Sequence, residues 1–150
     1  MTQIDIGRHY QEIEVRGASS LDCTIQMYDL AITDLRKAVD CLGSGDIEGR
    51  TAALVHCLDV LEQLQLNLQM DTGGEAAQQL YHFYSLARAK VLEAQLKCNR
   101  KLLEEIGDAF SKVRVMWVEV RRNYQPVALV NEPWAQPSAD VDHGRSAWSA

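Results

Sequence analysis

The sequence contains few residues that break helices. Its three prolines all lie at or after Pro126. Because proline disrupts the interior of a helix, residues 1–125 can form long uninterrupted helices. Residues 124–150 show no apolar periodicity and are rich in Pro, Ser, Ala and Asp, which predicts a largely disordered tail. The composition therefore divides the chain into a helical body and a flexible tail.

Positive charge and long apolar runs are also scarce. The net charge is −6, which disfavours nucleic acid or an anionic membrane surface as a partner. No segment approaches the roughly 18 unbroken apolar residues that span a bilayer. Residues 1–16 contain acids and lack the apolar core of a secretory signal. We therefore expect a cytoplasmic protein that binds neither nucleic acid nor membrane.

Motifs for metal binding and catalysis are missing. The four cysteines form no CxxC pair, and we expect them to serve as small apolar side chains. Neighbouring His56 and Cys57 point about 100° apart on a helix and are poorly placed to share a metal. The sequence contains no Glu-x-x-His pair of the di-iron bundles, no phosphate-binding loop and no nucleophile elbow. No residue set therefore resembles an active site, and we expect no enzyme activity, cofactor or metal.

Apolar residues recur four times with the 3.6-residue period of a helix. The four stretches run from about residue 18 to 43, 46 to 69, 74 to 98 and 99 to 122, and short loops join them. Short loops make neighbouring helices antiparallel. The sequence therefore predicts an all-α fold, an antiparallel up-down four-helix bundle over residues 18–123. An N-terminal arm at 1–17 precedes it, and the tail at 124–150 follows. The apolar stripes of the four helices comprise Leu21, Ile25, Tyr28, Ile32, Leu35, Val39 and Leu42; Ala53, Leu54, Cys57, Leu58, Val60, Leu61, Leu64 and Leu68; Ala76, Leu80, Phe83, Tyr84, Ala87, Val91 and Ala94; and Leu102, Ile106, Ala109, Phe110, Val113, Trp117 and Val120.

The predicted helix ends carry recognisable signals. Ser19 and Asp22 resemble a capping-box start for the first helix, and Asn99 is a candidate N-cap for the fourth. The pair Gly73-Gly74 precedes the third helix. It follows a helix rather than a strand and lacks the lysine of a phosphate loop, so we interpret it as a chain reversal that needs positive φ. Thr72 and Glu75 flank the pair at capping-box spacing.

Some apolar residues fall outside the core stripes. Tyr81, Leu92 and Leu96 lie on one face of the third helix, and Val55 and Leu66 lie on the outer side of the second, about three turns apart. Exposed apolar residues in register are candidate partner contacts. Tyr28 and Trp117, by contrast, are expected in the core or in the floor of a groove.

Five motifs in order give the sequence a more specific resemblance. They are "HYQEIEVRGASS", "QMYDLAITDLRKA", "LQMDTGGEAAQQLYHFY", "VLEAQLKCN" and "VRVMWVEV". Their order and spacing over roughly residues 9–120 resemble the flagellar secretion chaperone family, FliS. Members of that family are cytoplasmic four-helix bundles that bind the C-terminal amphipathic region of flagellin. They prevent its premature polymerisation and keep it competent for type III export.

The resemblance also implies roles for particular residues. Tyr10, Ile13 and Val15 match the family's N-terminal arm, which can cover part of the groove when no client is bound. The resemblance leaves open whether a co-chaperone or an export-gate component also binds. Two other classes remain as alternatives. One is another helical type III secretion chaperone or adaptor with a different client, and the other is a ligand- or metal-binding bundle enzyme.

Overall fold

The structure is a computed structural model that describes residues 17–124, with side chains from residue 20 onward. Four helices follow one another: α2 (Gly17–Ser44), α3 (Ile47–Leu66), α4 (Gly74–Lys97) and α5 (Arg100–Asn123). No strand occurs within residues 17–124, so the predicted all-α class and helix bundle are confirmed. Apart from their end residues Gly17 and Tyr124, the predicted arm and tail lie outside the described residues.

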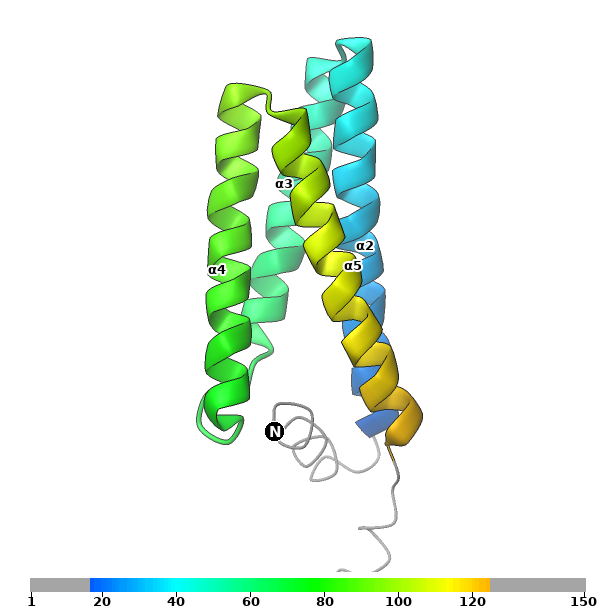
Figure 1. The fold of residues 1–150 in the computed structure, drawn as a ribbon, viewed down its shortest axis with the longest axis vertical. Coiled ribbons are helices and arrows are strands. Elements are labelled where there is room, and N and C mark those ends of the chain that lie inside the picture. Colours follow the sequence, from blue (N-terminus) through cyan, green and yellow to red (C-terminus); the bar gives the residue numbers. More distant parts are fainter. Residues whose placement is uncertain (1–16, 125–150) are drawn as a thin grey trace, which may run out of the picture.

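The four helices run alternately up and down, as the short loops predicted (Figure 1). Helix α2 packs against α3 and α5, and α4 packs against the same two helices from the other side. Figure 1 shows α4 and α5 joined by a tight turn at one end and spreading apart toward the other. The α2–α5 side and the α3–α4 side are therefore opposite sides of the bundle.

The core contains the predicted apolar stripes together with further buried residues such as Ala31, Ala38 and Leu103. Every residue assigned to the four stripes is buried or half-buried. Burial of a large apolar side chain contributes about 1.5–3 kcal/mol, so these stripes dominate the stability of the bundle. Tyr28 lies at the centre, where its ring centroid is 5.3 Å from that of Phe110 and its hydroxyl is 2.7 Å from that of Tyr84. Trp117 and Phe83 complete this aromatic cluster.

Two predicted features of the helix ends are confirmed. Asn99 is the N-cap of α5, and its side-chain oxygen accepts a hydrogen bond from the Leu102 backbone N–H at 3.0 Å. Gly74 has φ +59°, a conformation that side chains disfavour. Gly73 is needed for a second reason. A Cβ there would lie 2.6 Å from both the Ala77 Cβ and the Gln69 carbonyl oxygen.

The predicted capping box around Gly73-Gly74 is wrong. Gly73 itself is the N-cap of α4 and makes no side-chain cap bond, so Thr72 lies one residue too early to cap the helix. Glu75 instead accepts a hydrogen bond from the side chain of Gln79 at 3.2 Å. The helix therefore starts one residue later than the capping box predicted.

Other predicted ends also differ. Helix α2 begins at Gly17, so Ser19 and Asp22 lie inside its first turns and do not start it. The carboxylate of Asp22 pairs with Arg121 of α5 instead. Helix α3 begins at Ile47 with Asp46 as its N-cap and ends at Leu66, three residues before the predicted Gln69.

The four cysteines, which we expected to serve as small apolar side chains, differ in their exposure. Cys41 and Cys57 are buried, whereas Cys23 and Cys98 are exposed. Cys23 falls on the solvent-facing side of α2, about a quarter of a turn from Asp22, whose carboxylate reaches α5. Cys98 is the left-handed C-cap of α4, with φ +50°. All four are free thiols.

Candidate partner-binding surface

Helices α3 and α4 are joined by a polar cluster near the α4 C-terminus. The buried Arg50 donates through Nε to the Gln95 side-chain oxygen at 3.0 Å and contacts the Cys98 sulfur at 3.3 Å. Gln95 in turn donates to the Thr51 hydroxyl at 2.8 Å. A guanidinium placed between two neutral acceptors ties the first turns of α3 to the last turns of α4.

A second polar cluster joins the other ends of the same two helices. Gln65 is only 9% exposed and donates to the Ser85 hydroxyl at 2.6 Å and to the Tyr81 carbonyl at 3.1 Å. Its carbonyl oxygen accepts from Arg88 at 2.9 Å, and Arg88 also lies 3.5 Å from Glu62. Buried polar groups need such partners, so this cluster holds α3 and α4 in one fixed register.

That register places the leftover apolar residues at two matching levels of α3 and α4. Because the helices are antiparallel, Val55 lies level with Leu92, and Leu66 lies level with Tyr81. Along each helix the two levels are about three turns, or roughly 16 Å, apart. On a helical wheel Tyr81 and Leu92 share one face with Ser85 and Arg88, whose side chains reach α3.

All five predicted contact residues of the helices are exposed. Their exposed fractions are 52% for Val55, 70% for Leu66, 47% for Tyr81, 53% for Leu92 and 84% for Leu96. We call this set the α3–α4 apolar surface. The sequence prediction listed the α3 and α4 members separately, and the structure places them on the same side of the bundle.

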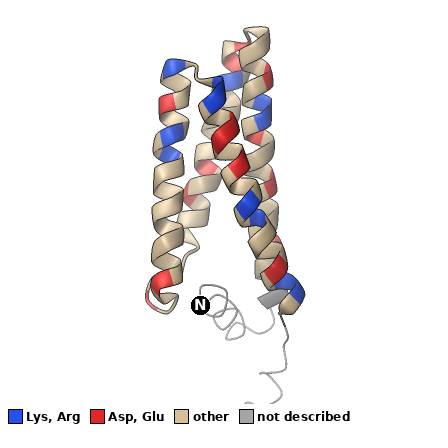
Figure 2. Cartoon of the chain, in the orientation of Figure 1, with Lys and Arg blue, Asp and Glu red and all other residues tan. Residues whose placement is uncertain are grey.

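Charge is sparse on the first half of α4. Residues 76–87 contain no Lys, Arg, Asp or Glu, and Figure 2 shows this half of the helix free of coloured charges. The charged pair Arg88–Glu62 lies between the two apolar levels. The surface can thus receive an amphipathic helix that presents apolar side chains about three turns apart.

Comparison with known proteins identifies the family of the chain. The sequence profile of the family "Flagellar protein FliS" matches residues 3–124, which include the whole described bundle. The chain belongs to the FliS family. The flagellar secretion chaperone FliS of Salmonella typhimurium is 26% identical over 110 residues, an alignment that covers 73% of this chain and 82% of the relative. The resemblance predicted from the five motifs is confirmed.

The FliS bundle places the remaining predicted residues in different ways. Tyr28 and Trp117 are buried in the core, at 0% and 5% exposed, as the sequence predicted. Their rings pack against each other in the aromatic cluster, and neither presents an exposed surface to a partner. Tyr10, Ile13 and Val15, the predicted arm residues, lie outside the described part of the chain.

The sequence prediction missed several exposed apolar residues. Leu30 of α2, Leu86 of α4 and Val115 and Met116 of α5 are all exposed. Leu86 lines a small cavity of about 110 Å³ between α4 and α5, whose floor includes Phe83. The signal was present in the sequence, since these residues interrupt the polar faces of their helices. They belong to three different helices, α2, α4 and α5, and none of them lies on α3.

Residues 17–124 were compared with the patterns of a metal site and of a membrane-spanning helix. No group of three or more His, Cys, Asp or Glu in this part of the chain could hold a metal ion. None of its four helices is both long and apolar enough to cross a bilayer. His56 forms one close pair, in which Nδ1 lies 2.6 Å from the Asp34 carboxylate on α2.

Proposed function

We propose that this FliS-family chain is a flagellar export chaperone that binds the C-terminal amphipathic region of flagellin in the cytoplasm. It prevents premature polymerisation and keeps the subunit competent for type III export. The observation that carries the proposal is the family match over residues 3–124. The name of the Salmonella relative, a flagellar secretion chaperone, supports the same function.

The α3–α4 apolar surface is the proposed docking site for one helix of the client. A helix whose apolar side chains recur over three turns can bury residues against Tyr81 and Leu66 at one level and against Leu92 and Val55 at the other. Leu96 extends the surface toward the α4–α5 turn. A client that wraps several faces would bury a standard interface of roughly 1,600 Å², partly offset by the cost of ordering the segment.

The N-terminal arm is proposed as the switch of this site. In the free protein Tyr10, Ile13 and Val15 cover apolar groups of the bundle, and they rearrange when flagellin binds. Such an arm shields apolar surface that otherwise promotes aggregation. The role of the protein is binding rather than catalysis, and a co-chaperone or an export-gate component can join the complex afterwards.

The proposal is tested by co-purification with flagellin from the same organism, either full-length or truncated to remove its C-terminal region. The full-length protein should be captured in a stoichiometric complex, and the truncated protein should not. Failure to capture full-length flagellin contradicts the proposed function and points to another client. Capture of the truncated protein retains a flagellin chaperone but moves the binding site to another part of the client.

A further inference from the structure

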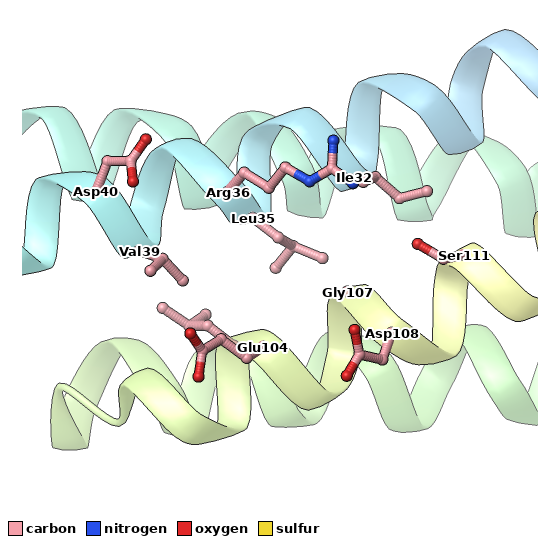
Figure 3. Close-up of a pocket in the computed structure, with 10 residues that line it drawn as sticks. Ile32, Leu35, Arg36, Val39, Asp40, Glu104, Gly107, Asp108 and Ser111 are labelled. Carbon is pink, nitrogen blue, oxygen red and sulfur yellow. The ribbon is translucent and has the colours of Figure 1, made fainter.

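A second groove runs between α2 and α5, on the side of the bundle opposite the α3–α4 apolar surface. Its volume is about 330 Å³. In Figure 3 the side chains of Leu35 and Val39 point from α2 into the groove, Leu35 toward Gly107 of α5 and Val39 toward the turn that carries Glu104. Ile32 and Leu103 complete an apolar floor. The groove is therefore apolar inside and lies between two rigid helices.

The rest of the α2–α5 seam is closed by ion pairs. Arg114 pairs with Asp29, and Arg121 pairs with Asp22. Across the groove itself, no ion pair joins the described residues of α2 and α5. The register of the two closed pairs places Asp40 of α2 level with Glu104 of α5, so two carboxylates flank the groove at this level. The same seam thus changes from oppositely charged partners to like charges where it opens.

Neither the packing nor the backbone conformation of α5 requires a glycine at Gly107. It lies in the interior of α5, where glycine is the least favourable residue after proline. A Cβ at this position would meet no atom within 4 Å, so close packing does not require its absence. The backbone conformation does not require it either, since the positive-φ glycines of the described chain are Gly45 and Gly74. What the glycine does is keep the floor of the groove open.

The rims of the groove carry excess negative charge. Glu104 and Asp108 lie one turn apart on α5, and Asp40 lies on the α2 rim (Figure 3). Glu104 has a partner in Arg100 at 3.3 Å, whereas Asp40 and Asp108 form no ion pair with any described residue. Arg36 is the one basic lining residue, and its guanidinium lies along α2 rather than across the groove (Figure 3).

We propose that the α2–α5 groove binds an amphipathic helical segment of a partner protein that carries a Lys or Arg one turn from an apolar side chain. The apolar side chain enters above Gly107, between Leu35 and Leu103, and the cation pairs with Asp108. Positions three or four apart share one face of a helix, which fits this spacing. The proposal does not rest on flagellin binding, and the two sites can be occupied together.

The test uses a fluorescent peptide of about 16 residues, long enough to form a helix on binding, with Leu and Lys alternating at three- and four-residue spacing. Fluorescence anisotropy measures its affinity for the full chain. Two variants alter the groove: Gly107→Leu fills its floor, and Asp108→Asn removes the charge. Asp59→Asn is the matched control, because it removes one exposed carboxylate of α3 that forms no ion pair with the described residues.

Gly107→Leu and Asp108→Asn should each weaken binding by about tenfold, whereas Asp59→Asn should leave it within about twofold. A peptide with Glu in place of Lys should not bind. Circular dichroism checks that each variant keeps its helices. Equal losses for Asp108→Asn and Asp59→Asn would mean general attraction to an acidic protein and would overturn the proposal. Unchanged affinity of a folded Gly107→Leu variant would overturn it as well.

Discussion

At the scale of single residues, the aromatic centre of the bundle contains two buried hydroxyls that satisfy each other. The hydroxyls of Tyr28 and Tyr84 are 2.7 Å apart and come from helices that lie across the core from each other. Burial raises the pKa of Tyr28 from 10.0 to about 12. It also raises the pKa of the Cys57 thiol from 9.0 to about 12. Both groups are therefore held in their neutral forms by the fold.

These two groups predict a loss of stability at alkaline pH. Because their pKa values are raised in the folded state, their contribution is complete below pH 9.0 and is lost as the pH rises toward about 12. Urea unfolding at several pH values should show a shallower decline for the double variant Tyr28→Phe, Cys57→Ala than for the natural sequence. Parallel declines would show that the pKa values of the two groups are not raised in the folded core.

Two glycines should respond to alanine in opposite directions. At Gly73 a Cβ would lie 2.6 Å from the Gln69 carbonyl, which cannot rotate away. Gly73→Ala should therefore destabilise the protein by about 1–3 kcal/mol. Gly107→Ala should stabilise it by up to about 1 kcal/mol, since the space is open and the helix interior favours alanine.

Thermal unfolding of both glycine variants measures the difference. A stabilised Gly73→Ala variant would contradict the tight α3–α4 reversal. A destabilised Gly107→Ala variant would contradict the open floor of the α2–α5 groove.

Local signals were predictable from sequence only where a residue acts on its own neighbours. Asn99 caps α5 as expected, because the cap bond joins residues three apart. Gly74 adopts positive φ as expected, because the reversal itself demands it. Thr72 does not cap α4, since the exact geometry of the turn decides which residue becomes the N-cap. The partner of Asp22 was unpredictable because Arg121 lies 99 residues further along the chain.

At the scale of elements, the four helices and their buried faces could be read from the apolar period alone. The register between helices could not. It depends on polar residues such as Gln65 and Gln95, which look in the sequence like ordinary solvent-facing positions. The exposure of the five candidate residues was predictable because they interrupt polar faces. That Val55 faces the same side as Leu92 follows only from how α3 and α4 pack.

Gln65 should therefore matter more than an ordinary surface glutamine. Gln65→Ala removes hydrogen bonds to Tyr81, Ser85 and Arg88 at once, and should cost about 2 kcal/mol of unfolding free energy. Gln63→Ala on the same helix is the control, because Gln63 is exposed and bonds only to Asn67, four residues on. Its cost should stay below about 0.5 kcal/mol.

Urea denaturation of the two glutamine variants gives both values. If they are equally stable, the second polar cluster does not fix the α3–α4 register.

At the scale of the whole molecule, the bundle presents two different faces. The α3–α4 apolar surface suits a client held mainly by apolar burial, whereas the α2–α5 groove adds acidic rims. In the two proposals, apolar burial binds the client at the α3–α4 apolar surface, and charge attraction contributes to binding of a second partner at the α2–α5 groove. The net charge of −6 favours a cationic second partner. In a chaperone of the FliS family, such a division would let a second protein recognise the complex without displacing the client.

Salt should separate these two modes of binding. Flagellin capture should weaken by less than roughly tenfold at about 0.5 M salt, because apolar burial is not screened. Binding of the cationic peptide to the α2–α5 groove should weaken much more under the same conditions. Titration calorimetry over a salt series measures both affinities. A larger salt effect on flagellin than on the peptide would contradict this assignment.

The most direct test of the flagellin site uses two leucines of the same helix. Leu92 and Leu86 are 53% and 56% exposed, but they lie about 120° apart around α4. Calorimetry with the isolated C-terminal region of flagellin should show that Leu92→Asp weakens binding by about tenfold or more, while Leu86→Asp changes it by less than about twofold. Equal effects of the two changes, or full affinity of a folded Leu92→Asp variant, would contradict the α3–α4 apolar surface as the client site.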